Sequence, residues 1–339
     1  MSDNLKSGKV TIVIPVYNRQ DLIGPCIESA LRQTYENIKI LVVDDGSTDS
    51  TRTVVQQYME RDSRIELATQ EVNTGSMNKA LHDSILSCDT EFFTWIGSDD
   101  TYIPSAISQM VAQHRLHPAV DYVSYDLKMT EAGKDHCPYC SSAWPNWSGF
   151  ASMSPFKHYD KSSFVSLVYR SLCPPFPLNG MWKTSFFRSR NLTWVEYKGN
   201  TWSPDTLNAL RFFSKDMTMV HYNEFPLVIY RKHSGQDTVT GAVGEQIRCD
   251  ITLIEAIFEW FPLNLFLNPE ELRSGKHVAF LDRLKRLTLD HAGRHESTPL
   301  LKSALSDLSA KAHLYLWENR KEIPRETSES LSSFFKEYL

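Results

Sequence analysis

The chain has 339 residues, 41% hydrophobic and 23% charged, which is typical of a soluble globular protein with a substantial core. The formal net charge of −5 argues against a nucleic-acid partner, which favours a basic face. The polar first ten residues lack the apolar centre of a secretory signal, so we expect a cytoplasmic protein. The most apolar run, 251–267, contains two glutamates and a proline and is too interrupted for a membrane span.

Six cysteines are spread along the chain, and without an export signal we expect them to be free thiols. Cys137 and Cys140, preceded by His136, have the spacing of a metal or redox pair. No second pair completes a four-ligand set. A loop with two ordinary cysteines is therefore the alternative to a zinc or redox role.

Strand-like and helix-like segments alternate from residue 9 to residue 125, which favours a succession of β-α-β units. Apolar residues at helical spacing indicate helices that start near Pro25, Ser50, Met77 and Pro104. We therefore expect an α/β fold with a mostly parallel sheet flanked by helices. Short β-branched or aromatic runs predict its strands at residues 10–14, 38–43, 64–68, 92–96 and 121–125.

The regular alternation fades after Asp126, although one more strand is predicted at residues 225–230. From about residue 245 the pattern is helical. We expect one domain over residues 1–240, with halves at 9–125 and 126–240, and an α-helical C-terminal region over 241–339. Burial in a helical core is the default for the apolar side chains of residues 258–266. A homodimer surface or a peripheral membrane contact is the alternative.

The predicted strand at 92–96 runs almost directly into two adjacent acids, Asp99 and Asp100. In an open α/β sheet, ligands bind outside the carboxyl ends of the strands. Two neighbouring carboxylates repel each other unless a cation lies between them and the ligand. Mg²⁺ or Mn²⁺ prefers such oxygen ligands and can also hold a diphosphate. The alternative is a helix N-cap, a position where Asp is favoured.

Two other predicted strands also end in polar residues, namely Asp44-Asp45 and Asn73-Thr74-Gly75. A carboxylate at a strand end can accept a hydrogen bond from a nucleobase N–H, and turn chemistry is the alternative. The residues after the first strand, Pro15 to Arg19, contain no glycine, and no phosphate loop ending in GK[ST] is present. These absences argue against a dinucleotide-dependent dehydrogenase and a P-loop hydrolase.

Four motifs, taken in order, resemble those of the family 2 glycosyltransferases, which have the GT-A fold. Each motif is weak alone, but their succession is specific, most clearly over residues 9–125. The resemblance implies an inverting transfer of sugar from a nucleoside-diphosphate sugar, with UDP as the expected nucleotide. The motifs are Ile14-Pro15-Val16-Tyr17-Asn18-Arg19, Val42-Val43-Asp44-Asp45-Gly46-Ser47-Thr48-Asp49, Asn73-Thr74-Gly75 and Ser98-Asp99-Asp100.

The same resemblance implies which residues bind the donor. The acidic pair stands where the family has its metal motif, usually Asp-x-Asp, with Ser98 in place of the first acid. Asp100 is then the expected ligand of Mn²⁺ or Mg²⁺, and Asp99 the contact to the sugar or ribose. The other positions that match the nucleotide and donor site are Pro15, Tyr17, Asp45, Asn73, Gly75 and Asn78.

Two later segments also resemble family motifs. The family places its catalytic base at the start of a late helix, here Asp205, with Pro204 in place of the usual Glu. An acid stabilised by the helix dipole is the alternative for Asp205. The stretch Tyr230–Ser234 is similar to an Arg-x-His loop, which implies that Arg231 lies beside the diphosphate. His233 is then a metal ligand or, alternatively, a solvated loop residue.

The implied reaction has Asp205 take a proton from an acceptor hydroxyl while that oxygen attacks the anomeric carbon. The expected acceptor is a glycan or a lipid-linked sugar of polysaccharide or glycoconjugate biosynthesis. One alternative is an inactive nucleotide-sugar or glycan-binding module. Another is a nucleotidyltransferase, which would need a glycine-rich basic loop after the first strand. Aromatic rings of the middle segment either stack on sugars or fill the core: Trp144, Trp147, Trp182, Trp194 and Trp202.

Overall fold

The computed structural model divides the chain into two compact units. The first contains Met1–Asp160, Pro175–Glu196 and Lys215–Thr240, and the second contains Lys161–Pro174, Tyr197–Ser214 and Gly241–Leu339. The structure describes residues 6–75, 77–131, 156–159, 179–190, 192, 208, 211–212, 215–222, 226–232, 306, 310, 313–314, 317–318, 320–321 and 325–338. The candidate site lies in the first unit.

An eight-stranded sheet forms the centre of the first unit, in the order β3-β2-β1-β4-β9-β6-β10-β8. The first four strands in this order run parallel to one another, as do β6 and β10, whereas β9 runs antiparallel to both β4 and β6. The expected α/β fold with a mostly parallel sheet is therefore confirmed. The strands are β1 (Lys6–Val16), β2 (Ile38–Asp44), β3 (Ile65–Thr69), β4 (Thr90–Trp95), β6 (Tyr122–Tyr125), β8 (Phe156–Tyr159), β9 (Met181–Lys183) and β10 (Met219–Tyr222).

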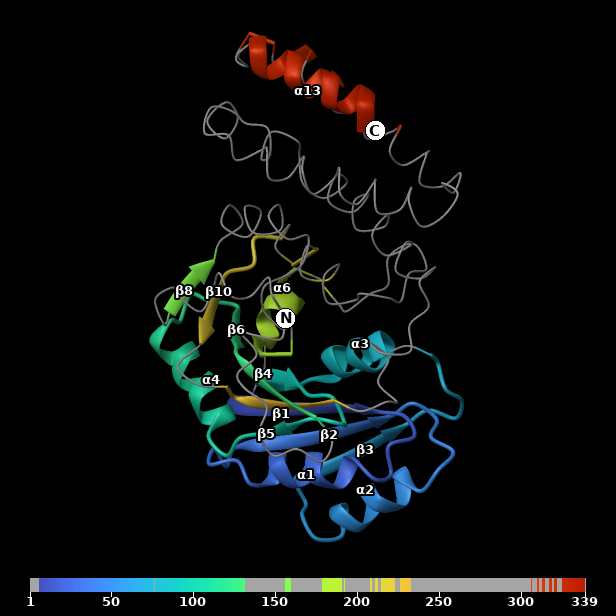
Figure 1. The fold of residues 1–339 in the computed structure, drawn as a ribbon. Coiled ribbons are helices and arrows are strands. Elements are labelled where there is room, and N and C mark those ends of the chain that lie inside the picture. The colour runs from blue at the N-terminus through green and yellow to red at the C-terminus, as the bar shows by residue number, and fades with distance from the viewer. Residues whose placement is uncertain are drawn as a thin grey trace. The chain divides into compact units, whose positions relative to one another are not determined.

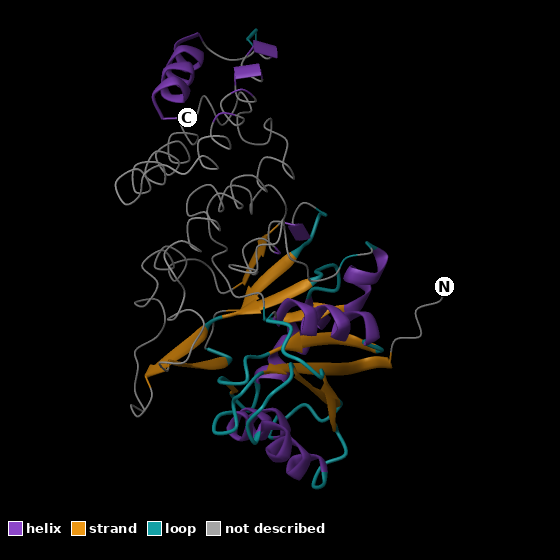
Figure 2. Ribbon diagram, turned by 90° about the vertical axis from the view of Figure 1, so that its right-hand side faces the viewer, coloured by secondary structure: helices purple, strands orange, loops and turns teal. Residues whose placement is uncertain are grey.

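Helices cover both faces of this sheet (Figures 1 and 2). Alternate residues of β1, such as Val10, Ile12 and Ile14, are fully buried in one apolar cluster together with side chains of α1, α2 and α4. The opposite face lies against α3 and α6 (Figure 1). The helices are α1 (Ile23–Leu31), α2 (Thr51–Met59), α3 (Met77–Ser87), α4 (Ala106–Leu116) and α6 (Thr184–Ser189). This two-sided burial explains the continuous apolar runs of the central strands.

A second, three-stranded sheet has the order β5-β11-β7, with β5 at Thr101–Tyr102, β7 at Leu127–Glu131 and β11 at Val228–Lys232. Strand β5 directly follows the acidic pair and pairs antiparallel with β11, so that Val228 lies opposite Tyr102. This small sheet therefore brings the late strand β11 alongside the loop that follows β4.

The predicted strands and helices up to residue 125 are present, with bounds that differ by a few residues. The fading pattern after Asp126 did not predict β7, β8, β9 or β10, which are only three to five residues long. In the second unit the structure describes helix α13 (Arg325–Tyr338). The proposed boundary at residue 240 stays a prediction. Among the described residues, no helix has the length and hydrophobicity that spanning a membrane requires.

Candidate active site

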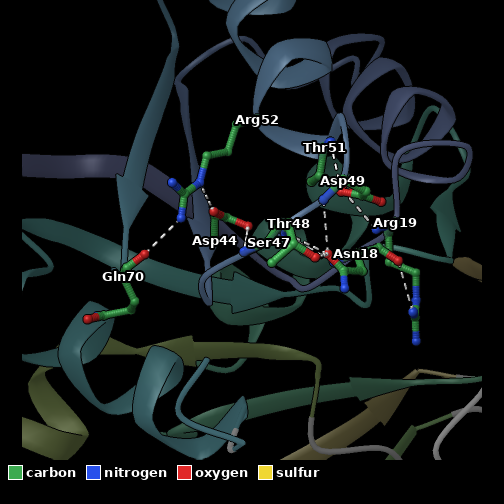
Figure 3. A network of polar contacts seen from close by, with 9 residues as sticks. All are labelled: Asn18, Arg19, Asp44, Ser47, Thr48, Asp49, Thr51, Arg52 and Gln70. Atoms are coloured by element: carbon green, nitrogen blue, oxygen red, sulfur yellow. Dashed lines mark hydrogen bonds and ion pairs between the residues drawn. The ribbon is translucent and has the colours of Figure 1, made fainter. Parts of the chain in front are cut away.

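Asn18 joins the loop after β1 to the turn after β2 (Figure 3). Its backbone has φ of 49°, in the left-handed region that Asn tolerates better than most residues. Its N–H donates to Ser47 Oγ over 2.9 Å, and its Oδ1 accepts from the N–H of Thr48 over 2.8 Å. The two neighbouring loops that follow β1 and β2 are therefore held in a fixed relation.

Asp44 and Asp45 have different environments, although they are adjacent. The Asp44 side chain is fully buried, where it accepts from Ser47 N over 3.2 Å and forms an ion pair with Arg52 of α2. Arg52 in turn donates to the carbonyl of Gln70 after β3 over 2.8 Å (Figure 3). Asp44 thus stabilises the turn that carries Asp45.

Asp45 lies beside Tyr17 at the carboxyl edge of the sheet. The Asp45 N–H donates to the Val16 carbonyl over 2.9 Å, and Tyr17 follows Val16 with 38% of its surface exposed. The Asp45 carboxylate accepts hydrogen bonds from the N–H and the hydroxyl of Thr74, and the residue keeps 9% of its surface exposed. The backbone thus brings a residue with an accessible aromatic ring next to a residue with a carboxylate acceptor.

The loop after β3 is shaped by two glycines and an asparagine. Asn73 Oδ1 accepts from the N–H of Gly75 over 2.7 Å, and Gly75 has φ of 72°. Gly46 has φ of 79°, and a Cβ on it would lie 2.5 Å from the Asn73 backbone nitrogen. Gly46 therefore lets the loops after β2 and β3 approach each other, as a residue with a side chain does not.

The acidic pair after β4 is fixed by Arg231 of β11. Asp100 is 4% exposed, and its Oδ1 accepts from the Arg231 N–H over 3.0 Å. The Arg231 guanidinium donates to the Asp99 carbonyl and, over 3.2 Å, to the Leu22 carbonyl. A Cβ on Gly97 would lie 2.7 Å from Asp99 Oδ1 and 3.2 Å from Asp100 Oδ2, so both carboxylates come close to Gly97.

This arrangement places excess negative charge in a poorly solvated position. Burial, and secondarily the charge of Asp99, raise the pKa of Asp100 well above its usual range, while Arg231 opposes the rise. A divalent cation with oxygen ligands would relieve this repulsion, so the two carboxylates fit Mg²⁺ or Mn²⁺. Within the described part of the chain, no group of three or more His, Cys, Asp or Glu is arranged around a metal position.

Pro15 is buried near the end of β1. Pairing between β1 and β4 ends at Val13, so the missing N–H of Pro15 costs no hydrogen bond to β4. Asn78 is on α3, but its side chain, Asp205 and His233 lie outside the described residues, as do Cys137 and Cys140.

Trp182 is fully buried and stacks on Tyr122 with ring centroids 4.0 Å apart, so it fills the core and is not available to a sugar. The other four tryptophans of that segment also lie outside the described residues.

Comparison with known proteins decides the family. Residues 11–169 match the family model described as glycosyl transferase family 2. Residues 11–169 belong to glycosyl transferase family 2. It is 33% identical over 140 residues to an uncharacterized glycosyltransferase of Rickettsia prowazekii, a match that covers 41% of this chain and 42% of that relative. The chain thus spans less than half the length of this relative.

Two solved structures share the fold of this chain. TarS 1–349 of S. aureus, crystallised with UDP-GlcNAc, aligns with a TM-score of 0.63 at 15% identity, over 97% of this chain and 92% of that one. Mannosyltransferase PcManGT of Pyrobaculum calidifontis, in complex with GDP-Man and Mn²⁺, aligns with a TM-score of 0.50 at 15% identity, over 97% and 84%. The GT-A fold expected from the four motifs is confirmed.

Three residues of this family 2 site received no individual role from the sequence: Asn18, Arg52 and Thr74. Asn18 carries a usable signal, because an Asn in the turn that follows a strand tolerates the left-handed conformation. Arg52 and Thr74 carry none, because each acts through a partner on another loop or strand end.

Proposed function

We propose that the chain is a metal-dependent inverting glycosyltransferase that moves a sugar from a UDP-sugar to a hydroxyl of a glycan or lipid-linked acceptor. The match of residues 11–169 to glycosyl transferase family 2 supports the reaction class. TarS and PcManGT, whose structures contain UDP-GlcNAc and GDP-Man, support a nucleotide-sugar donor. The expected setting is polysaccharide or glycoconjugate biosynthesis.

The observation that carries the proposal is the position of three carboxylates, which directly follow the two strands that flank β1. Asp45 follows β2 beside the exposed ring of Tyr17, and Asp99 and Asp100 follow β4. Two strand spacings of about 4.8 Å separate β2 from β4, so these carboxyl ends are about 10 Å apart. A nucleoside diphosphate with its base at Tyr17 and Asp45 can bridge this distance to the acidic pair.

Each residue then has a distinct task. Tyr17 stacks on the base, Asp45 accepts from a base N–H, and Asn73, Gly75, Asn78 and Pro15 line the nucleotide and donor site. Asp99 contacts the sugar or ribose. Asp100, with His233 as a further ligand, holds Mn²⁺ or Mg²⁺, which stabilises the negative charge of the diphosphate leaving group when bound. Arg231 adds positive charge beside this group.

Asp205 accepts the proton of the acceptor hydroxyl as the oxygen attacks the anomeric carbon from the side opposite the diphosphate. General-base assistance of this kind contributes about 10²–10⁴-fold. An Asp205→Asn variant should therefore transfer sugar at least about 100 times more slowly and still bind the nucleotide. Unchanged turnover in this variant would remove Asp205 from the role.

The experiment that tests the function starts with a thermal-shift screen of nucleotide sugars with and without Mn²⁺, because a ligand that binds the folded state raises the melting temperature. A stabilising donor is then incubated with acceptor sugars, and released nucleoside diphosphate is measured. Failure of every nucleotide to bind would contradict the proposal. Binding without metal-dependent release would instead favour the inactive nucleotide-sugar or glycan-binding module, an alternative supported by Ser98 and Pro204 in place of the usual acids.

A further inference from the structure

Thr74 contacts the Asp45 carboxylate with two donors at once. The Thr74 N–H lies 3.0 and 3.1 Å from the two carboxylate oxygens, and its hydroxyl oxygen lies 2.9 and 3.0 Å from them. Neither donor favours one oxygen, so Thr74 faces the carboxylate symmetrically from one side. Such paired hydrogen bonds to a charged group restrict its rotation more than a single contact does.

The backbone around Thr74 is independently fixed. On its N-terminal side, Asn73 packs so closely against Gly46 that no Cβ fits between them. On its C-terminal side, the turn from Asn73 Oδ1 to the Gly75 N–H holds the next peptide. The backbone of Asp45 is also fixed, because its N–H donates to the Val16 carbonyl. The relative position of Thr74 and Asp45 therefore follows from contacts on both loops.

A carboxylate has about four lone-pair directions, and the two Thr74 donors occupy one side of the group. The remaining lone pairs have a fixed direction and can only accept. A base whose ring nitrogen carries a hydrogen, such as N3 of uracil, can donate to them. Cytosine presents a lone pair at its N3 and would leave the Asp45 acceptor facing another acceptor.

We propose that Thr74 is a positioning residue that sets the specificity of the site for nucleotides with a ring N–H, uracil over cytosine. The proposal rests on the proposed function, because it concerns the nucleotide subsite of the same donor. Thr74 acts through Asp45. Without the Thr74 hydroxyl, the Asp45 carboxylate can rotate, and its free lone pairs no longer point in one fixed direction. The discrimination between the two pyrimidines then falls, whereas the fold is retained.

The test is isothermal titration calorimetry of UDP and CDP, each with Mn²⁺, against the wild-type chain and three variants. Thr74→Val removes the hydroxyl but keeps the side-chain shape and the N–H. Thr74→Ser keeps both donors. Thr53→Val makes the same chemical change at an exposed position of α2. Melting temperatures of all four proteins report whether the fold is intact.

We expect the ratio of UDP to CDP affinity to fall about five- to tenfold in Thr74→Val, and to stay within about twofold of wild type in Thr74→Ser and Thr53→Val. A general loosening of the loop would weaken UDP and CDP alike and leave the ratio unchanged. An unchanged ratio in a folded Thr74→Val protein overturns the inference. If Thr74→Val does not fold, Thr74→Ala is measured by the same criterion.

The two proposals fail in distinguishable ways. Absence of UDP binding by the wild-type chain would contradict the proposed function. UDP binding by the wild-type chain, together with equal preference in wild type and Thr74→Val, would contradict the role of Thr74 alone.

Discussion

The backbone N–H of Arg231 donates to Asp100 Oδ1 over 3.0 Å, although the two residues are 131 positions apart in the chain. The contact is possible because β11 pairs with β5, which begins immediately after Asp100. The same arginine contacts the carbonyl of Leu22, in the segment between β1 and α1. Arg231 therefore joins three separate segments around the acidic pair.

Replacement of Arg231 by Lys should loosen this arrangement, because an ammonium cannot reproduce the planar fork that contacts the Asp99 and Leu22 carbonyls together. The backbone bond to Asp100 and the positive charge are retained. We expect the stabilisation by Mn²⁺ and UDP to fall by about 1–2 kcal/mol, measured as the shift in melting temperature with ligand. Equal ligand shifts in wild type and Arg231→Lys would show that charge alone matters. Arg320→Lys, on an exposed position of the second unit, serves as the control.

Asp100→Asn should make the metal-free protein more stable at pH 8. The pKa of Asp100 is raised by burial and by Asp99, so the folded state binds more protons than the unfolded state above pH 3.8. Stability is therefore lost as the pH rises from the unfolded pKa through the raised folded pKa, by about 1.4 kcal/mol for each unit of the shift. Asn keeps an oxygen for the Arg231 N–H and has no such loss.

Urea unfolding at pH 5 and pH 8, with and without Mn²⁺, measures both effects. Wild type should gain more stability from Mn²⁺ at pH 8 than at pH 5, because the metal competes with the proton. Asp100→Asn should gain little at either pH. A variant that is less stable than wild type at pH 8 without metal would contradict the explanation.

Local sequence patterns predicted the sheet edge and the acids on it because both depend on short-range signals. The apolar runs before Asp45 and Asp99 identify strands, and the residue numbers then show that each acid follows a strand end. The strand β9 could not be found in this way. Its three residues, Met181–Lys183, are defined by antiparallel pairing to β4 and β6, which are distant in sequence.

The same limit applies within the site. The motif containing Thr74 was visible, but the contact that gives it a role involves Asp45, which lies in the turn after β2, 29 residues away. The family resemblance singled out Asp45 over Asp44, but the ion pair that buries Asp44 completely is visible only in the tertiary packing. Trp182 similarly needed its Tyr122 contact before its role in the core was evident.

His114 should make the protein sensitive to acid. The imidazole is buried against Phe92, its Nε2–H donates to the Met181 carbonyl over 3.1 Å, and burial lowers the pKa of His114 to about 3. In the unfolded chain the ordinary value is 6.5, so the unfolded state binds the extra proton first. The contribution is complete above pH 6.5 and is lost as the pH falls toward 3, by up to about 1.4 kcal/mol per pH unit.

His114→Gln retains a donor for the Met181 carbonyl and does not titrate. Its free energy of unfolding should be lower than that of wild type at pH 7.5, because Phe92 loses its stacked ring, but should decline less between pH 6.5 and pH 4. Denaturant titrations at four pH values give the two slopes. Parallel curves for both proteins would assign the acid sensitivity to other groups.

Gly46 and Gly75 form a matched pair for testing the close approach of the two loops. Both have positive φ, 79° and 72°, so alanine at either position carries the strain of the left-handed region, about 1–2 kcal/mol. They differ in their surroundings: a Cβ at Gly75 meets nothing within 4 Å, whereas one at Gly46 lies 2.5 Å from Asn73 N and 2.7 Å from the Val72 carbonyl carbon. Gly46→Ala must therefore also push the loop after β3 away from Asp45.

We expect Gly75→Ala to lower the free energy of unfolding by the strain alone, and to weaken UDP binding less than Gly46→Ala does, because its Cβ meets nothing within 4 Å. Gly46→Ala should be destabilised by a further 1–3 kcal/mol or so and should bind UDP at least about tenfold more weakly. On the same preparations, chemical denaturation measures the loss of stability and calorimetry measures the loss of UDP affinity. The backbone strain is common to both variants, whereas displacement of the loop after β3 is expected in Gly46→Ala alone. Similar UDP affinities in the two variants would therefore show that nucleotide binding does not require the close approach of the loops.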